Sequence, residues 1–167
     1  MAKAELLKPF ILRWEGGFVD DPLDRGGATN KGITIGTFRN FYGKEATVEQ
    51  LKNITDEQWL HIFKCGFWDK WKADDINNQS IADIVVDWAW ASGTSIKQVQ
   101  KILGVAVDGI VGNDTLTAIN TADQRTLFDK IHSRRIEFVE NIVKRDPSQT
   151  RFLKGWKNRI NSLTFSE

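Results

Sequence analysis

Residues 14–34 read WEGGFVDDPLDRGGATNKGIT, and this stretch separates a short amphipathic helix from the rest of the chain. Four apolar residues before it recur at the helical spacing i, i+3, i+4, i+7: Leu7, Phe10, Ile11 and Trp14. They predict a helix over residues 3–15, which the glycines at 16–17 would stop. Residues 18–32 contain turn signals and glycines without a sustained period, so we expect a loop.

Helical patterns dominate the chain beyond this loop. The expected helices cover residues 55–71, 80–91, 95–103, 113–121, 123–145 and 148–163. Capping boxes are expected at three helix starts: Thr47 with Gln50, Thr55 with Gln58, and Ser95 with Gln98. Strand signals are few, and residues 32–35 form a short candidate. The sequence therefore predicts a mainly α fold.

The character of the sequence changes near Gly93, where no linker rich in proline, serine or glycine occurs. We therefore expect two packed regions, residues 1–92 and 93–167, instead of two domains on a flexible tether. The first region carries a net charge of −3 and the second a net charge of +4. This difference fits ordinary surface variation, or a basic region that favours an anionic surface such as a bacterial envelope.

Composition excludes several classes of protein. The chain has 167 residues, of which 27% are charged and 41% hydrophobic, a globular balance. One cysteine and two histidines exclude a disulfide framework and a structural zinc site. The net charge of +1 gives no global field for nucleic acid, and no apolar run approaches the roughly 18 residues of a membrane span. We expect no metal or organic cofactor, no nucleic-acid partner and no transmembrane segment.

Glu15 is the candidate catalytic residue. It lies on the edge of the apolar stripe, beside Trp14, at the carboxyl end of the expected helix. Partial burial and the negative helix end both favour the protonated carboxyl that a general acid needs. The glycines that follow leave room for a substrate. The alternative, an ordinary surface glutamate at a helix end, does not explain the elaborate loop after it.

Polar side chains that could complete such a site follow in the loop and just beyond it: Asp20, Asp21, Asp24, Thr29 and Thr34. Glycosidic cleavage needs a proton donor and a second group across the sugar, which positions water or stabilises positive charge. An aspartate nine residues after Glu15, on a loop that folds back, could supply that group. The alternative is turn formation through the carboxylate, which suits Asp20 and Asp21 better than Asp24.

Residues 15–34, EGGFVDDPLDRGGATNKGIT, resemble the signature of glycoside hydrolase family 108, the N-acetylmuramidase-like endolysins of phages and bacteria. The family pattern E-G-G-[YF]-x-x-D-P-x-D-x-G-G-x-T-x-x-G-I-T fits throughout. The resemblance implies peptidoglycan hydrolysis at the bond between N-acetylmuramic acid and N-acetylglucosamine, with Glu15 as the catalytic acid. The wider lysozyme-like superfamily has an Asp nine residues after the Glu and then a Thr. This order implies catalytic roles for Asp24 and Thr29, with Thr34 as the alternative threonine.

The second region is similar to the peptidoglycan-binding region that is usually fused to that family. Residues 100–104, QKILG, and 107–112, VDGIVG, with Thr115 and Ala118 after them, match L-Q-x-x-L-G…D-G-x-x-G-x-x-T-x-x-A. Val99 replaces the usual leucine. The two glycines of the second block also suit tight turns in a plain helical hairpin.

Further candidate substrate-binding residues come from both regions: Asp21, Thr34, Asp87, Trp90 and Asp108. Residues 87–93, DWAWASG, resemble the family's D-x-A-V-N-x-G, but Trp90 and Ala91 replace Val and Asn. Asp87 lies in an otherwise apolar helix, so it must either bond inward or face the cleft. We expect each of the seven tryptophans to be a core residue first, with one or two at a cleft rim.

Together these resemblances imply a lysozyme-like helical muramidase region packed against a helical peptidoglycan-binding region. One alternative is a lytic transglycosylase that uses Glu15 and the sugar's own hydroxyl, and another is a non-catalytic wall-binding or secretion-accessory protein. We expect a monomer with bacterial peptidoglycan as its partner. It would be made in the cytoplasm without a signal peptide and act at the cell wall or periplasm, after release through a holin-like pore, lysis or an exporter.

Overall fold

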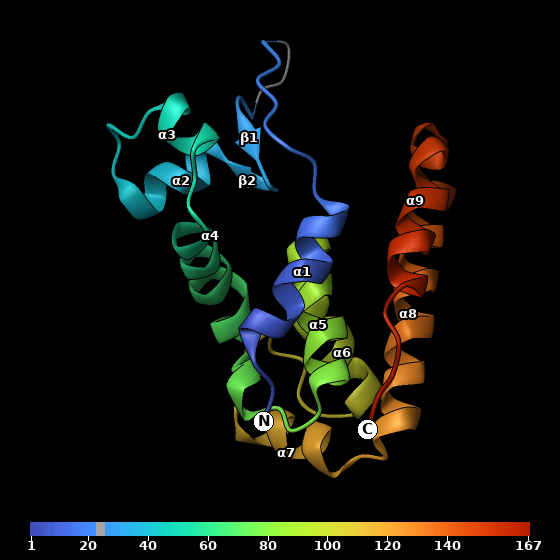
Figure 1. Cartoon of the computed structure of the whole chain (residues 1–167). Helices are drawn as coiled ribbons and strands as arrows, with labels where there is room; N and C mark the ends of the chain where they lie inside the picture. Colours follow the sequence, from blue (N-terminus) through green and yellow to red (C-terminus); the bar gives the residue numbers. More distant parts are fainter. Residues whose placement is uncertain (23–25) are drawn as a thin grey trace. The chain divides into compact units, whose positions relative to one another are not determined.

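The computed structural model describes residues 1–22 and 26–167, which form two compact units. The N-terminal unit is Ala4–Gly66, and the C-terminal unit is Met1–Lys3 together with Phe67–Glu167. Helices dominate both units, and one two-stranded hairpin is the only sheet in the described residues, so the predicted mainly α fold is confirmed (Figure 1). The change near Gly93 falls inside the C-terminal unit, and the division at that point stays a prediction.

The N-terminal unit begins with α1 (Ala4–Trp14), and its other helices are α2 (Ile35–Tyr42), α3 (Val48–Lys52) and α4 (Asp56–Phe63). The strands β1 (Thr29–Asn30) and β2 (Ile33–Thr34) lie between α1 and α2. Apolar side chains from these elements fill the core: Leu7, Ile11, Ile33, Phe38, Leu51, Trp59 and Ile62. The capping boxes predicted for α3 and α4 are confirmed, because Thr47 and Thr55 each exchange bonds with the glutamine three residues later.

The helix predicted over residues 55–71 is wrong beyond Phe63. The chain continues there as a π-helical turn, η1 (Lys64–Trp68), and two 3-10 turns, η2 (Asp69–Trp71) and η3 (Ala73–Asp75). Phe63 and Trp68 are both fully buried although they lie five residues apart. A five-residue spacing is out of phase with an α-helix but fits one π turn, so burial of both rings overrides the α-helical pattern.

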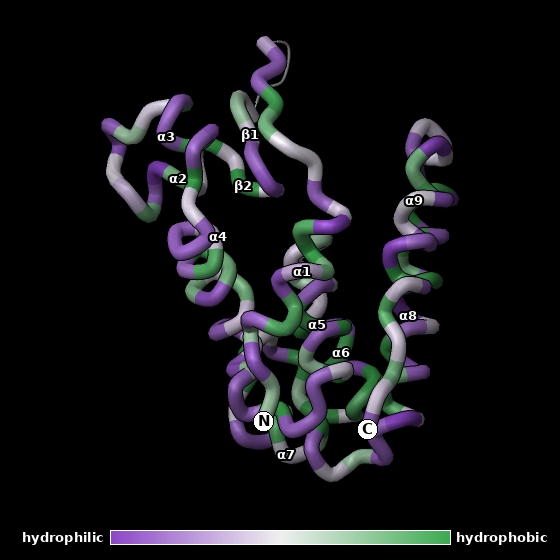
Figure 2. Tube along the Cα trace, viewed as in Figure 1, coloured by the Kyte–Doolittle hydropathy of each residue, from purple (hydrophilic) through white to green (hydrophobic). Residues whose placement is uncertain are grey.

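The C-terminal unit is a helical array. It contains α5 (Gln79–Ser92), α6 (Ser95–Leu103), α7 (Asn113–Thr121), α8 (Gln124–Arg145), η4 (Pro147–Gln149) and α9 (Thr150–Asn161). α5 packs against α6 and α8, and eight of the nine positions from Ser80 to Trp88 are buried, all except Asp83. The apolar helix predicted over residues 80–91 is therefore confirmed, and it is buried. Hydrophobic residues recur among hydrophilic ones along α8, and α9 returns beside its carboxyl end (Figure 2).

The capping box predicted at Ser95 with Gln98 is wrong. The N-cap of α6 is Thr94, which makes no side-chain cap bond, and Ser95 is the first residue of the helix. Ser95 is buried, and its hydroxyl accepts a hydrogen bond from Trp71 Nε1 at 3.0 Å. The serine side chain is therefore used to satisfy a buried indole N–H, a demand that only tertiary packing creates.

Candidate active site

Glu15 lies at the carboxyl end of α1, directly after Trp14. Its backbone N–H donates to the carbonyl of Ile11 at 3.0 Å, so helical hydrogen bonding extends to Glu15. Buried Ile11 and an ion pair of 3.3 Å between Lys8 and Asp56, in the first turn of α4, hold the helix within its unit. The backbone that carries the half-buried Glu15 side chain is therefore held in place.

The two glycines after Glu15 leave open space beside it. A Cβ added to Gly16 or to Gly17 would meet no atom within 4 Å, and both residues are exposed. Neither glycine has a positive φ, so the backbone conformation does not require glycine at either position. What the two glycines contribute is the absence of side chains next to the carboxyl group, as a substrate approaching Glu15 would need.

The chain returns from this open segment into the β1–β2 hairpin. Thr29 pairs with Thr34, and Asn30 pairs with Ile33, around a two-residue turn. The turn residues Lys31 and Gly32 have φ values of 52° and 81°, the two positive values that a type I′ turn requires. Val19 and Thr29 exchange backbone hydrogen bonds of 2.9 and 2.8 Å, which fix the strand against the segment that follows Glu15.

Two side chains anchor the hairpin to the helices of the N-terminal unit. Asn30 is buried, and its Nδ2 donates to the carbonyls of Leu51 at 3.0 Å and Lys52 at 3.1 Å, at the end of α3. Trp59 Nε1, on α4, donates to the carbonyl of Lys31 at 3.0 Å. The hairpin position is therefore determined by buried hydrogen bonds as well as by its two short strands.

The two candidate threonines differ in how their hydroxyls are used. Thr34 is the N-cap of α2, where its Oγ1 accepts from the Thr37 backbone N–H at 3.1 Å and also bonds the Thr37 hydroxyl. The hydroxyl of Thr29 has no hydrogen bond within the described residues, and its side chain is half-buried. Cross-strand partners point to the same face of a hairpin, so both threonines lie on one face. Within the part of the chain that the structure describes, Thr29 is therefore the candidate whose hydroxyl is not already used in a hydrogen bond.

The candidate aspartates lie in the segment that joins Val19 to the hairpin. Asp20 and Asp21 are exposed, and Asp21 makes a polar interaction within the protein. Asp24, the candidate for the second catalytic group, lies outside the described residues. Its role therefore stays a prediction that rests on its spacing from Glu15.

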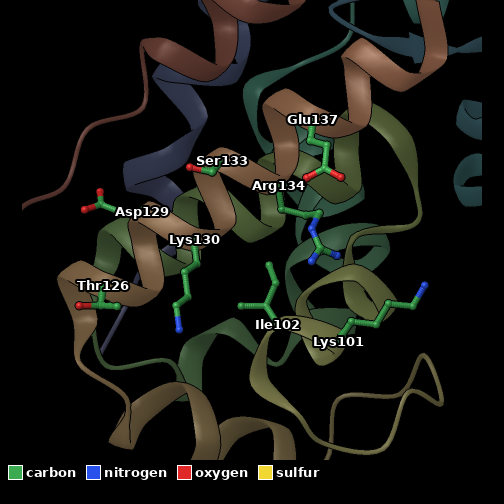
Figure 3. A pocket seen from close by; sticks show the side chains of 8 residues that line it. All are labelled: Lys101, Ile102, Thr126, Asp129, Lys130, Ser133, Arg134 and Glu137. Atoms are coloured by element: carbon green, nitrogen blue, oxygen red, sulfur yellow. The ribbon is translucent and has the colours of Figure 1, made fainter. Parts of the chain in front are cut away.

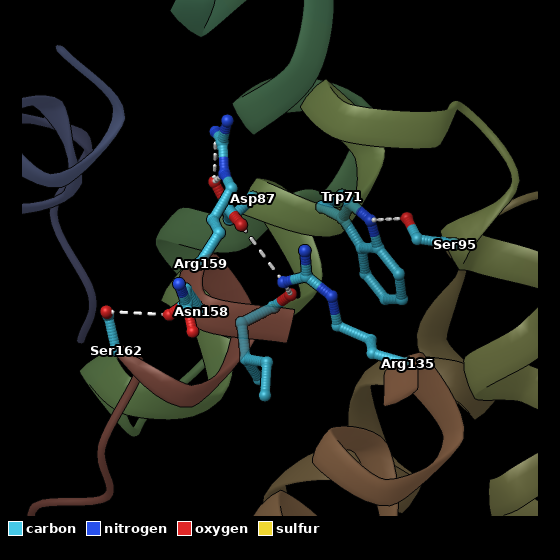
Figure 4. A network of polar contacts seen from close by, with 8 residues as sticks. Trp71, Asp87, Ser95, Arg135, Asn158, Arg159 and Ser162 are labelled. Atoms are coloured by element: carbon cyan, nitrogen blue, oxygen red, sulfur yellow. Dashed lines mark hydrogen bonds and ion pairs between the residues drawn. The ribbon is translucent and has the colours of Figure 1, made fainter. Parts of the chain in front are cut away.

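Asp87 lies on α5 in the C-terminal unit and bonds inward. Its side chain is fully buried between two arginines (Figure 4). Oδ1 accepts from Arg159, on α9, at 2.7 Å, and Oδ2 forms an ion pair of 3.0 Å with Arg135, on α8. The distance between Arg135 and Oδ2 is that of a direct ion pair. This cluster joins three helices, and neither arginine stood out in the sequence because the partners are 48 and 72 residues away.

Burial shapes the ionisation of the groups around Asp87. Burial lowers the pKa of the Arg135 guanidinium, and the Asp87 carboxylate counteracts that effect. One helical turn before Asp87, burial raises the pKa of Asp83 to about 6. A hydrogen bond of 2.7 Å from Gln79 lowers this pKa, and the negative charge of Asp87 raises it further.

The remaining candidates, Trp90 and Asp108, also lie in the C-terminal unit. Trp90 is half-buried, and its ring packs at 4.7 Å from that of Phe67. Asp108 is exposed, and its Oδ1 accepts from the backbone of Ile110 at 2.9 Å and from Gln100 Nε2 at 3.0 Å. The hydrogen bonds from Ile110 and Gln100 lower the pKa of the Asp108 carboxyl.

Gln100 organises the turn that contains Asp108. Its fully buried amide also donates to the carbonyl of Ile110 and the hydroxyl of Thr115, and its Oε1 accepts from the Gly109 N–H at 3.0 Å. Gly109 has a φ of 76°. The motif residues of the second region therefore build one turn between α6 and α7. Asp108 stabilises this turn through its hydrogen bonds.

Two further features are absent from the described ranges, residues 1–22 and 26–167. These ranges contain no group of three or more His, Cys, Asp or Glu side chains placed to hold a metal ion. No helix in them is both long and apolar enough to cross a membrane.

Comparisons with known proteins match both regions of the chain. The sequence model of the glycosyl hydrolase 108 family matches residues 8–93, and that of a predicted peptidoglycan domain matches residues 94–161. No curated protein matches the chain. The solved structure of SagA from Brucella abortus is similar, with a TM-score of 0.79 and 29% sequence identity, over 96% of this chain and 90% of that one.

Proposed function

Because this chain belongs to the glycosyl hydrolase 108 family, we propose that it hydrolyses the β-1,4 bond between N-acetylmuramic acid and N-acetylglucosamine in peptidoglycan. Family membership and the peptidoglycan domain support the broader statement, that the protein is a peptidoglycan hydrolase. The choice of this bond, and of hydrolysis by general-acid catalysis, is the proposal.

Glu15 is the general acid in this proposal and protonates the glycosidic oxygen as the bond breaks. Asp24 orients the attacking water or stabilises the positive charge that develops on the sugar ring. Thr29 helps to hold that water through its hydroxyl. Asp21, Thr34, Asp87, Trp90 and Asp108 were predicted as substrate-binding residues. Among them, Asp87 serves first as the centre of a buried ion cluster.

The observation that carries the proposal is the setting of Glu15. A half-buried glutamate at a fixed helix end is followed along the chain by two residues without side chains, Gly16 and Gly17. The chain then returns as an anchored hairpin in which the hydroxyl of Thr29 is available within the described part of the chain. An acid next to a segment without side chains, and a hydroxyl on the hairpin that follows, are two of the elements that hydrolysis of a glycosidic bond needs.

The test compares wild type with Glu15→Gln on purified peptidoglycan sacculi. Clearing should fall by about 10²–10⁴-fold in the variant, the contribution typical of a general acid, while the melting temperature stays close to that of wild type. Glu5→Gln is the matched control, because Glu5 is an exposed glutamate of the same helix and should be dispensable. Full activity of Glu15→Gln would remove the proposed acid.

Mass spectrometry of the released fragments tests the bond and the route. Hydrolysis at the proposed bond leaves N-acetylmuramic acid at the reducing end. A lytic transglycosylase leaves an anhydro end that is lighter by one water, and a reducing-end N-acetylglucosamine would indicate the other glycosidic bond. If the protein sediments with sacculi but releases no fragments, it binds the wall without cleaving it.

A further inference from the structure

A groove runs between α6 and α8 in the C-terminal unit (Figure 3). Its volume is about 580 Å³, within the range of pockets that bind small ligands. Eight residues line it: Lys101, Ile102, Thr126, Asp129, Lys130, Ser133, Arg134 and Glu137. We propose that this α6–α8 groove binds the carboxylate groups of the peptide stems of peptidoglycan. This inference rests on the proposed function, because it takes peptidoglycan as the ligand.

Two of the three cations of the groove, Lys130 and Arg134, lie in one row on α8. Thr126, Lys130 and Arg134 are spaced four residues apart, so they lie along one face of α8. Figure 3 shows the side chains of Lys130 and Arg134 extending from α8 toward α6, with Ile102 between them. Neighbours at this spacing are about 6 Å apart on a helix, so two positive groups lie within reach of one short anionic chain.

None of these three cations forms an ion pair within the described residues, although the carboxylate of Glu137 also lines the groove. Among the described residues, no carboxylate lies within 4.0 Å of the ammonium groups of Lys101 and Lys130. The guanidinium of Arg134 is half-buried, and its hydrogen bond goes to the neutral Gln98 at 3.4 Å. Asp129 lines the same groove but is paired with Arg125, on the outer side, at 3.4 Å. Adjacent cations without counter-charges repel one another, and a bound carboxylate relieves that repulsion.

An apolar pocket of about 230 Å³ adjoins the charged part and shares Ile102, Thr126 and Lys130 with it. Small and branched side chains form its other walls: Leu103, Ala118, Ala122 and Leu127, with Asp123 at the edge. A ligand that fits both parts must combine negative charge with small apolar groups. Peptide stems have this chemistry, since they carry free carboxylates and alanine methyl groups. The glycan strand has no free carboxylate where the lactyl group of N-acetylmuramic acid is joined to a stem. The net charge of +4 on residues 93–167 agrees with an anionic ligand.

The test measures binding to sacculi with the full chain in the Glu15→Gln background, so that cleavage does not consume the ligand. Lys130→Gln with Arg134→Gln should weaken binding at least tenfold, as expected when charge-assisted hydrogen bonds are lost. The matched control is Arg151→Gln with Lys154→Gln, which removes the same charge from the exposed surface of α9 and should leave binding unchanged. Circular dichroism checks that both double variants fold.

Two treated substrates identify the bound group. An amidase cuts the bond between the lactyl carboxyl and the stem, so it releases soluble stems and soluble glycan strands with free lactyl carboxylates. The released stems should compete with intact sacculi for the Glu15→Gln chain, and the stem-free glycan should not compete. Hydrofluoric acid removes phosphodiester polymers and keeps the stems, and binding should survive this treatment. Equal binding of the groove variant and its background, or competition by the stem-free glycan, would overturn the proposal, and so would loss of binding after acid treatment alone.

Failure of this inference is distinguishable from failure of the proposed function. Fragment release by the chain with native Glu15 reports cleavage, whereas sedimentation of the Glu15→Gln chains reports groove binding. Cleavage without groove-dependent binding contradicts only the inference about the groove. Groove-dependent binding to stems without any cleavage contradicts only the proposed hydrolysis.

Discussion

Replacing Asp83 with asparagine should stabilise the protein at neutral pH and leave it unchanged near pH 4. Asp83 lies on α5, and burial raises the pKa of its carboxyl to about 6 from an ordinary value of 3.8. Asparagine has nearly the same shape, stays neutral at every pH and can still accept the hydrogen bond from Gln79 Nε2 at 2.7 Å. The substitution therefore removes the cost of ionising a buried carboxyl and retains its contact.

The sign and size follow from proton linkage. Below about pH 4 the carboxyl is protonated in both the folded and the unfolded chain, so ionisation costs no stability. Between about pH 4 and pH 6 the folded protein keeps a proton that the unfolded chain releases, so the free energy of unfolding falls as pH rises. A pKa difference of about two corresponds to roughly 3 kcal/mol. Because Asp83 is partly exposed, we expect about 1–2 kcal/mol.

The measurement is urea denaturation of wild type and Asp83→Asn at pH 4, 5, 6 and 7.5, followed by circular dichroism. The stability difference should be near zero at pH 4 and should grow to its full value by pH 7.5. Asp20→Asn is the control, because it removes the same charge from an exposed loop. A difference that is constant with pH, or a variant less stable than wild type at pH 7.5, would refute the reasoning.

Three further predictions concern the buried bonds and the hairpin. Asp87→Asn should lower the free energy of unfolding by about 3–5 kcal/mol, because it leaves Arg135 buried without its counter-charge. A loss under about 1 kcal/mol in urea denaturation would contradict this prediction. Asn30→Ala should lower the free energy of unfolding by about 1–3 kcal/mol, since two carbonyls at the end of α3 lose their donor. An unchanged denaturation midpoint would show that the hairpin does not need this anchor. Thr29→Val should reduce the rate of sacculus clearing without changing stability. Thr34→Val should lower the free energy of unfolding by about 1 kcal/mol, because the cap of α2 is lost, and should keep most of the clearing rate. The opposite pattern would exchange the roles of the two threonines.

Local features of the fold were predictable where a few neighbouring residues decide them. The helix before Glu15, the caps at Thr47 and Thr55, and the burial of α5 all follow from spacing or composition within a short window. The predictions failed where a distant side chain imposed a demand. Trp71 required the hydroxyl of Ser95, and burial of Trp68 converted the end of a predicted helix into a π turn.

The candidate site divides in the same way. Its residue types and their order could be taken from the motif between residues 15 and 34. The motif could not show which of the two threonine hydroxyls is already used in a hydrogen bond, because the use of Thr34 depends on its becoming the N-cap of α2. The position of the hairpin was equally hidden, since the acceptors of Asn30 lie 21 and 22 residues further along the chain.

By itself, the sequence determined the helical class, the loop after the first helix and the motifs of both regions, because periodicity, capping and turn chemistry act over a few residues. Only the tertiary structure decided that Asp87 joins three helices through Arg135 and Arg159, and that Lys130 and Arg134 line one groove beside α6. Those arrangements depend on which helix faces meet, and burial enforces them by requiring every enclosed polar group to find a partner.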